Sequence, residues 1–315
     1  MGEASSTLAA VLADQSFASE VRALWSGLPN VLVGADEPLA QSLERLLAQR
    51  PHFVIVHGDD RLVSRALTAY HTQLRHKGYP LRLMPLAVGE LQFVSRAIDE
   101  DLSPRRVARV LHEHRASEDF ASRMLSCLKI SSSMEAAAQY GFSFGAGWLF
   151  AAFEAYHRSG RSGRTNLAAT AAHLTRDWVR SGEVPGRQGS AARVSVDYKS
   201  RSDASGYVLA STLEQSWFGT STVRTDGPAL VLGESALELV KRAALPRAVQ
   251  RVRPKVQQSE AFERVHLDGF PGFVLDGELY EPAHANVVQV AAGPRVHFVC
   301  PPGGGLSRLV RALKG

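Results

Sequence analysis

The chain has 315 residues, of which 45% are apolar and 21% charged, the composition of a globular protein that can bury a substantial core. Its formal net charge of +5 favours anionic partners such as phosphates or acidic lipid headgroups, but the excess is too small to predict nucleic-acid binding. No stretch approaches the roughly 18 to 20 apolar residues of a membrane-spanning helix, and the N-terminal region lacks the features of a secretory signal. These features predict a cytoplasmic protein, with peripheral attachment at the inner membrane surface as an open alternative.

The cysteines and histidines predict neither a disulfide framework nor a zinc site. Cys127 and Cys300 are the only cysteines, which is too few for either purpose. The eleven histidines show no pair at metal-ligand spacing beside a Cys or carboxylate cluster. We therefore expect two buried, reduced thiols.

Residues 1–125 are predicted to alternate helices and strands. The strand at 52–56 is almost wholly apolar, as expected of a parallel strand covered on both faces. The other expected elements are strands at 30–34 and 81–86 and helices at 6–27, 37–49, 62–77, 89–98 and 103–115. This order predicts an open parallel α/β sheet with right-handed crossovers.

The pattern changes after this segment. Residues 140–156 are rich in Gly and aromatics and become helical near their end, and 164–181 and 235–244 are also predicted to be helical. Short strands are expected at 193–198, 206–213, 219–225, 228–232, 263–267, 272–276, 286–290 and 295–299. Strands at this spacing suggest an antiparallel β-sandwich. The predicted architecture is an α/β domain over 1–125 followed by a mostly β domain over 126–299, with 300–315 packing back on the first domain as an open alternative.

Two successive strand ends carry glycine-bearing turns. The strand at 52–56 runs into His57-Gly58-Asp59-Asp60-Arg61, and the strand at 81–86 runs into a turn that contains Gly89-Glu90-Leu91. The carboxyl ends of parallel strands are where an α/β sheet places a ligand. Glycine permits close approach of the backbone to a phosphate because it has no Cβ and tolerates positive φ. The two turns together predict a nucleotide-binding edge.

Three further motifs follow in order: Phe144-Gly145-Ala146-Gly147-Trp148, Thr225-Asp226-Gly227-Pro228 and Leu275-Asp276-Gly277-Glu278. With the two turns, this series resembles the diacylglycerol kinase-type lipid kinases, a group that includes bacterial lipid kinases, sphingosine kinases and ceramide kinases. The corresponding turns of that family read Gly-Gly-Asp-Gly-Thr and Pro-Leu-Gly-Thr-Gly-Asn-Asp-Phe, and its last motif is Asp-Gly-Glu. The resemblance covers about residues 31–300 and implies the NAD kinase/diacylglycerol kinase-like fold.

The resemblance also implies a function, the ATP-dependent phosphorylation of a lipid hydroxyl of diacylglycerol or sphingoid type. Asp276 would be the general base that takes the hydroxyl proton, and Glu278 would support it. Asp226 would join the carboxylates near Mg²⁺. The nucleotide would contact four residues of the two turns: Gly58, Asp59, Arg61 and Gly89.

Both turns depart from the family pattern. Asp60 replaces a Gly and is predicted to cap the helix that follows it, the usual task of Asp at such a position. Arg61 could still contact phosphate through its planar guanidinium. In the second turn, Glu90 and Leu91 replace Asn and Asp, and Leu cannot orient a nucleotide. The family's opening Asn-Pro-x-Ser-Gly is not found. These departures favour an alternative function, a catalytically inactive pseudokinase that binds a lipid or a protein partner, whereas the complete Asp276-Gly277-Glu278 motif favours the kinase, so both functions stay open.

Two structural alternatives stay open at the remaining motifs. Asp226-Gly227 and Asp276-Gly277 each suit a tight turn, because Asp-Gly is a favoured pair there. The segment 241–255 contains six basic residues and no acid, so it is expected either to contact an anionic membrane or to form a solvated basic face. Its basic residues are Lys241, Arg242, Arg247, Arg251, Arg253 and Lys255.

Overall fold

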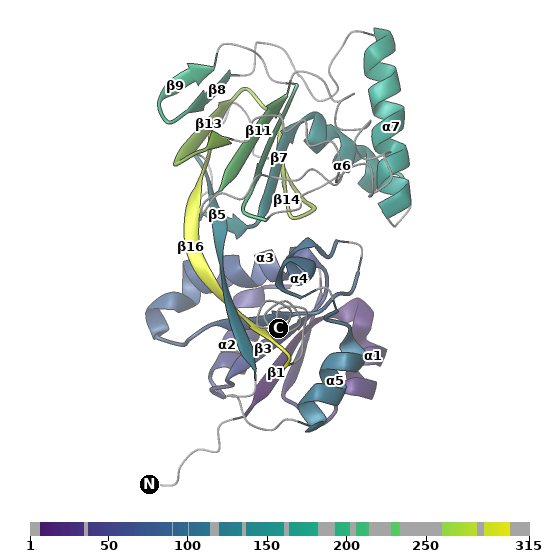
Figure 1. The fold of residues 1–315 in the computed structure, drawn as a ribbon, viewed down its shortest axis with the longest axis vertical. Coiled ribbons are helices and arrows are strands. Elements are labelled where there is room, and N and C mark those ends of the chain that lie inside the picture. Colours follow the sequence, from purple (N-terminus) through teal and green to yellow (C-terminus); the bar gives the residue numbers. More distant parts are fainter. Residues whose placement is uncertain are drawn as a thin grey trace, which may run out of the picture. The chain divides into compact units, whose positions relative to one another are not determined.

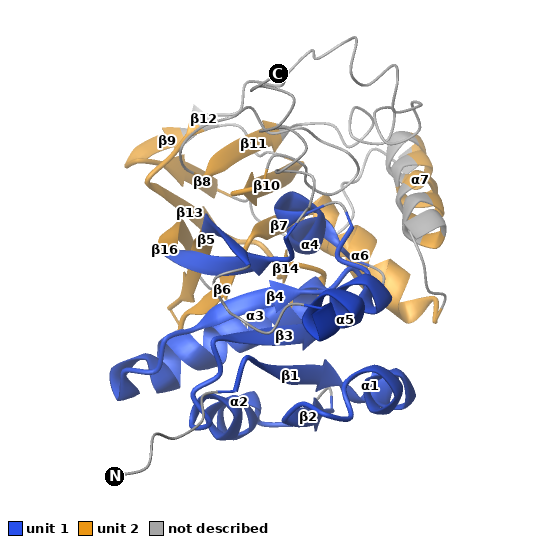
Figure 2. Cartoon of the chain, turned by 60° about the horizontal axis from the view of Figure 1, so that its bottom comes forward, with its two compact units in different colours: residues 1–125, 295–315 blue, residues 126–294 orange. Residues whose placement is uncertain are grey.

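In the computed structural model, the chain divides into two compact units, residues 1–125 with 295–315 and residues 126–294 (Figure 2). The structure describes residues 7–34, 37–89, 91–99, 101–113, 120–133, 137–160, 164–181, 193–201, 206–213, 228–233, 260–281 and 287–302. Among these residues, no helix is long and apolar enough to cross a membrane.

The first unit is built on a parallel sheet (Figure 1). Its strands are β1 (Ala9–Asp14), β2 (Asn30–Val33), β3 (Phe53–His57), β4 (Arg82–Pro85) and the last part of β16 (Val288–Cys300). They lie in the order β2-β1-β3-β4-β16, and every neighbouring pair is parallel. All five residues of β3 are buried, as expected of a parallel strand covered on both faces. The predicted open parallel α/β domain is confirmed.

Five α-helices accompany this sheet in the described part of the first unit. α1 packs against α5, and α2 packs against α3 and β2. The helices are α1 (Ala18–Leu24), α2 (Leu39–Leu47), α3 (Asp60–Ala69), α4 (Phe93–Ile98) and α5 (Pro104–Glu113). The single helix expected at 62–77 changes geometry after Ala69, becoming a π-helical turn over Tyr70–Leu74 and a 3₁₀ turn over Arg75–Lys77. Gly78, with φ of +77°, ends it in the left-handed region.

The helix predicted over 6–27 is wrong. Residues 9–14 form β1, a 3₁₀ turn follows over Gln15–Phe17, and only Ala18–Leu24 is α-helical. β1 pairs with β2 on one side and β3 on the other, and five of its six residues are buried. The alanines of this segment favour a helix locally. Pairing on both edges overrides that preference, because β propensity depends mainly on packing against neighbours.

The second unit holds two sheets that share one apolar core. One sheet is antiparallel and has the order β12-β11-β10-β7-β14-β15. The other contains β13 between β8 and the first part of β16, with β9, β5 and β6. Both sheets contribute to the core, for example through Phe144 and Phe273 from one and Val265 and Leu267 from the other. The predicted antiparallel β-sandwich is confirmed.

The strands of the second unit are mostly short. Two are long: β5 has 12 residues and β16 has 13. β16 is one continuous strand where two strands at 286–290 and 295–299 were expected. The bounds of the others are β5 (Ala121–Ser132), β6 (Gln139–Gly141), β7 (Ser143–Gly147), β8 (Arg193–Val196), β9 (Lys199–Arg201), β10 (Tyr207–Ser211), β11 (Ala229–Gly233), β12 (Glu260–Ala261), β13 (Arg264–Asp268), β14 (Phe273–Leu275) and β15 (Glu278–Tyr280). Two helices, α6 (Trp148–Arg158) and α7 (Arg164–Ser181), follow β7. The expected strand at 219–225 and helix at 235–244 lie outside the described residues.

Both cysteines are free and buried. Burial, with a smaller contribution from the Asp276 carboxylate, raises the pKa of Cys127 to about 12. Burial, with a smaller contribution from Asp99, raises the pKa of Cys300 to about 11. Because the thiolate is the reactive form, both thiols react slowly in the folded protein.

We expect neither thiol to react appreciably with an aromatic disulfide reagent at pH 8 while the protein is folded. In urea, both should react at the rate of an ordinary thiol, because exposure restores a pKa of about 8.5. The absorbance of the released thiolate measures both rates. Rapid reaction of either cysteine in the folded protein would contradict this burial.

Candidate functional site

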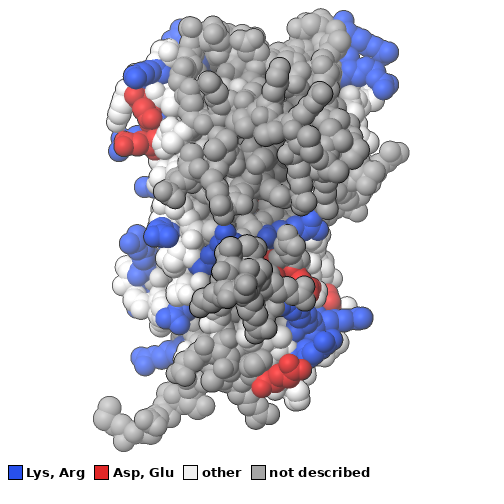
Figure 3. Space-filling view, viewed as in Figure 1, with Lys and Arg blue, Asp and Glu red and all other residues white. Residues whose placement is uncertain are grey.

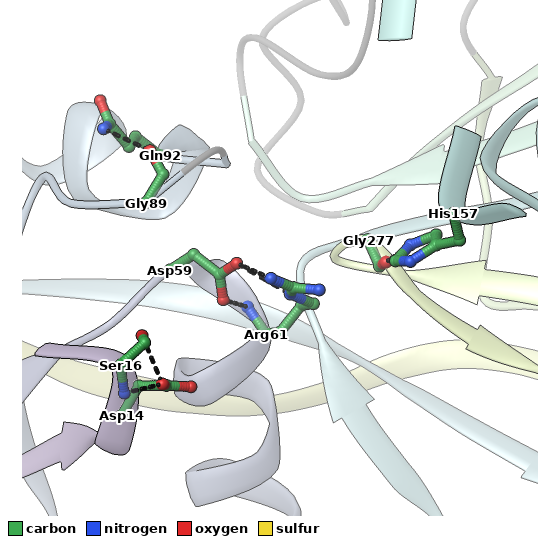
Figure 4. Close-up of polar contacts among 8 residues, drawn as sticks. All are labelled: Asp14, Ser16, Asp59, Arg61, Gly89, Gln92, His157 and Gly277. Carbon is green, nitrogen blue, oxygen red and sulfur yellow. Dashed lines mark hydrogen bonds and ion pairs between the residues drawn. The ribbon is translucent and has the colours of Figure 1, made fainter. Parts of the chain in front are cut away.

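The carboxyl ends of β1 and β3 lie at a switch point of the parallel sheet. From β1 the chain continues to β2 on one side, and β3 then pairs on the other side of β1. Open α/β sheets bind ligands at such a point. At the end of β1, Asp14 accepts hydrogen bonds from Ser16 N at 2.8 Å and Ser16 Oγ at 2.6 Å (Figure 4). The sequence prediction missed both residues because it placed them within a helix, although a buried apolar run that ends in Asp-x-Ser is a strand-and-turn signal.

The turn after β3 is closed by its own hydrogen bonds. Asp59 is the N-cap of α3, and its carboxylate accepts from Arg61 N at 3.1 Å and Arg61 Nε at 2.8 Å (Figure 4). Arg61 Nη2 lies 2.6 Å from the same carboxylate. Asp60 N donates to Leu91 O at 3.2 Å, and Leu62 N donates to Asp59 O at 3.1 Å. The amides that bind anions at the start of a helix therefore already have partners within the chain.

Asp60 does not cap α3 as predicted, because Asp59 does. The Asp60 side chain is only 3% exposed and instead accepts hydrogen bonds from Phe93 N at 2.6 Å and Val94 N at 3.2 Å. These amides open α4, so Asp60 binds the start of a different helix. Its backbone bond to Leu91 joins the same two segments. Asp60 thus connects the first turn to the second.

The two glycines of the predicted site lie where a side chain would not fit. A Cβ on Gly58 would lie 2.6 Å from Leu62 Cδ2, and one on Gly89 would lie 2.8 Å from Asp59 Cβ. Gly89 also has φ of +75°, a conformation that other residues rarely adopt. Its carbonyl accepts from Gln92 Nε2 at 2.9 Å (Figure 4). Packing against α3 is therefore enough to explain Gly58, and packing between the two turns is enough to explain Gly89.

The structure thus brings Gly58, Asp59, Arg61 and Gly89 together, as the sequence predicted, at one edge of the first unit. Glu90 and Asp226 lie outside the described residues, as does the basic segment 241–255. Within the described ranges, no group of three or more His, Cys, Asp or Glu side chains is arranged to hold a metal ion. On the face shown in Figure 3, the Lys and Arg side chains drawn in blue lie in several small groups, some beside acidic residues.

His57 is completely buried at the position where the resembled family carries its first glycine. Trp25 Nε1 donates a hydrogen bond to His57 Nδ1 at 2.9 Å, and His57 Nε2 lies 3.2 Å from Glu20 Oε2. The Phe17 ring lies 5.2 Å from the imidazole, centroid to centroid. A side chain with this many partners fills space that a glycine would leave open to a ligand.

Asp276 lies in the two-residue turn between β14 and β15. Asp276 and Gly277 both have positive φ, 48° and 91°, as in a type I′ hairpin turn, so the tight-turn interpretation is confirmed. The carboxylate is only 2% exposed and accepts from Phe142 N and Ser143 N, both at 2.8 Å. It therefore holds the hairpin against the turn that joins β6 to β7.

Glu278 and His157 lie beside this turn. Glu278, the first residue of β15, is half-buried and accepts a hydrogen bond from Tyr280 Oη at 3.2 Å. His157 Nε2, from α6, donates to Gly277 O at 3.2 Å (Figure 4). The sequence prediction missed His157, because nothing in the order of motifs connects α6 to the Asp-Gly-Glu turn.

No protein-family model and no curated protein sequence matches this chain. Solved structures from Bacillus anthracis str. Sterne do resemble it. One, described as a "putative diacylglycerol kinase", superposes with a TM-score of 0.62 at 10% identity, covering 96% of this chain and 98% of its own. Two others, described as a putative diacylglycerol kinase and a diacylglycerol kinase, have TM-scores of 0.55 and 0.54 at 12% and 11% identity, each covering 93% of this chain and 97% of its own.

The chain therefore has the fold of these diacylglycerol kinase-like proteins over nearly its whole length, as the order of motifs predicted. At these identities the similarity concerns the fold. The chemistry has to be argued from the side chains of this chain.

We expect Gly89→Ala to destabilise the protein by about 2 to 4 kcal/mol, since it combines a strained positive φ with a clash against Asp59. Gly78→Ala is the matched control, because Gly78 has nearly the same φ of +77° but no atom within 4 Å of the added methyl group. It should cost about 1 kcal/mol. Urea unfolding measures both, and equal losses would show that the two turns do not pack as described.

We expect Asp276→Ala to destabilise the protein by about 2 to 5 kcal/mol, because it leaves two buried amides without their acceptor. Glu278→Gln is the control, because the amide oxygen can still accept from Tyr280 and the change should stay within about 0.5 kcal/mol. An Asp276→Ala protein as stable as the wild type in urea would show that the carboxylate does not hold this turn.

Proposed function

We propose that this protein binds a lipid and does not transfer phosphate to it. The observation that carries the proposal is the hydrogen bonding of the turn 57–61. The Asp59 carboxylate accepts hydrogen bonds from both the backbone amide and the guanidinium of Arg61. The alternative role of a pseudokinase, raised by the sequence, is the one that this geometry supports best.

Phosphoryl transfer depends on donors that are free to bind phosphate oxygens as charge develops on them. In this chain the α3 amides of Asp60, Arg61 and Leu62 are bonded internally. Asp60, which stands where the resembled family carries a Gly, also adds a carboxylate to this turn, and it would repel an anionic ligand. ATP with Mg²⁺ therefore does not fit the residues present in the way that the resembled family implies.

The lipid half of the proposal is supported by the fold and by the second unit. The resemblance to the lipid kinases implies that the mostly β domain over 126–299 holds the lipid acceptor, and the β-sandwich lies in this part of the chain. The hairpin that carries Asp276, Gly277 and Glu278 is held there by hydrogen bonds to the turn between β6 and β7 and to α6. Contact of the basic segment 241–255 with an anionic membrane belongs to this proposal, because six cations without an acid suit such a surface.

A second candidate function is ATP-dependent phosphorylation of a lipid hydroxyl with Asp276 as general base. The observation that favours it is the complete Asp276-Gly277-Glu278 motif. Glu278 is half-buried beside the turn, and His157 donates a hydrogen bond to the Gly277 carbonyl. It would require Asp276, now 2% exposed, to become accessible to a substrate hydroxyl.

A calorimetric titration with ATP and Mg²⁺ separates the two candidates. We expect no saturable heat at millimolar nucleotide and no transfer of labelled phosphate to diacylglycerol or sphingosine. A protein with the same fold and measurable kinase activity should be run alongside to validate the assay. Saturable binding with lipid phosphorylation that is lost in Glu278→Gln would overturn the proposal, because this substitution is expected to leave the fold intact.

Lipid binding itself is tested by flotation with phosphatidylcholine vesicles, with and without diacylglycerol, and with vesicles that contain phosphatidylserine. Binding that requires diacylglycerol and persists in high salt would support a lipid site. Binding that requires phosphatidylserine and disappears in high salt would indicate only surface attraction. A variant with Gln at all six basic positions of 241–255 should lose the second kind of binding and keep the first.

A further inference from the structure

The imidazole of His57 forms a three-part hydrogen-bonded chain with Trp25 and Glu20 inside the first unit. His57 ends β3 and is 0% exposed, whereas Trp25 follows α1 directly and is 2% exposed. Glu20 lies in the first turn of α1 and its side chain is 40% exposed. Both hydrogen bonds to the ring therefore come from α1 and the residue that ends it, and they fix that helix to the first turn.

The partners of His57 determine its protonation state. The indole Nε1–H of Trp25 can only donate, so His57 Nδ1 must offer a lone pair. The carboxylate of Glu20 can only accept when ionised, so the ring hydrogen is on Nε2. The ring is therefore the neutral Nε2–H tautomer, with both nitrogens in use.

The charges around the ring are few. Glu20 on α1 is the charged group that the described structure places against it. Ala13 pairs with His57 across β1, and the next residue, Asp14, keeps its carboxylate on Ser16. The 3₁₀ turn before α1 contributes the uncharged Phe17 ring, and β4 contributes Pro85 beside Val56.

The acidic residues of the first turn are engaged elsewhere. Asp59 is paired with Arg61, and Asp60 is bonded to the start of α4.

Adding a proton to this ring has opposing effects. It would strengthen attraction to Glu20, but that carboxylate is largely solvated and its field is screened. It would also bury a charge and put a new Nδ1–H against the Trp25 Nε1–H, so that two donors face each other. The unfavourable effects prevail, since burial lowers the pKa of His57 more than Glu20 raises it.

We propose that His57 and Trp25 form an acid-sensitive latch, in which uptake of one proton from solvent at His57 Nδ1 breaks the Trp25 hydrogen bond and releases α1 from the first turn. α1 is a short helix of seven residues, of which only Val21 is buried, so its release does not require the sheet to unfold. The latch lies wholly within the first unit, and it does not depend on whether the protein binds nucleotide or lipid.

The direction of the pH dependence follows from linkage. The released ring has an ordinary pKa near 6.5, whereas the latched ring has a lower one. Above pH 6.5 both forms are neutral, and opening does not depend on pH. As the pH falls from 6.5 toward the lower value, opening takes up a proton, and its equilibrium constant rises by up to tenfold per pH unit.

Amide hydrogen exchange of α1 between pH 7.5 and pH 5 tests the latch on the full chain. After correction for the intrinsic exchange rate, opening of residues 18–24 should be constant above pH 6.5 and should rise by up to tenfold per unit below it. Opening of β3 should not change in parallel. Nitrogen-15 spectra of the His57 ring should show the Nε2–H tautomer at pH 7.5. A charged ring at that pH, or exchange of α1 with no acid dependence, would overturn the proposal.

His57→Asn is the decisive variant, because its side-chain oxygen can accept from Trp25 near the place of Nδ1 but cannot take up a proton. We expect α1 in this variant to lose its acid dependence, and persistence of the tenfold rise would contradict the latch. His71→Asn is the matched control, since His71 is also a histidine of the first unit whose pKa is lowered by burial. It should leave the acid response of α1 unchanged. If His57→Asn does not fold, Glu20→Gln tests the same device. It removes an attraction that raises the pKa of the latched ring, so the onset of opening should stay near pH 6.5 and the rise should continue to lower pH than in the wild type; a rise that stops at a higher pH than in the wild type would contradict the latch.

Discussion

The contact between the turns that follow β3 and β4 is the constraint on which the first unit depends. Asp60 accepts the two amides that open α4 and donates its own amide to Leu91, while Gly89 rests against Asp59. Each of these bonds uses a backbone or carboxylate group that a nucleotide-binding turn would present to a ligand. The edge of the sheet is thereby held by contacts within the protein.

The second unit shows a similar use of a carboxylate. Asp276 occupies a left-handed position that favours glycine, yet its two oxygens each accept a buried amide from the neighbouring turn. Asp suits this place because its short side chain tolerates positive φ and reaches nearby backbone donors. A residue that resembles a catalytic base thus has a sufficient structural reason to be present, and the two roles do not exclude each other.

Much of the fold could be predicted from the sequence, because apolar strands and glycine-bearing turns are specified by residues that lie close together in the chain. The apolar run 52–56, which forms β3 with a shift of one residue, and the Asp-Gly pair at 276–277 are examples. The failures have a common physical cause. β1 was mistaken for a helix because its pairing partners are distant in sequence, and Asp60 was assigned to the nearer helix because the amides of α4 are 33 and 34 residues away. At the site, the grouping of Gly58, Asp59, Arg61 and Gly89 was predictable, but the bonds that occupy these residues were not. Those bonds depend on side-chain geometry, as does the contact of His157 with Gly277.

The course of β16 has a consequence for how the chain is made. Its last residues pair with β4 in the first unit, and its first residues pair with β13 in the second. During synthesis, β4 therefore emerges long before its outer neighbour, and its edge amides and carbonyls lack that partner until residues 288–300 have been translated. An uncovered parallel edge of this kind is slow to complete and prone to wrong pairing. The nascent protein should therefore depend on chaperones or on rapid completion of translation more than its modest size suggests.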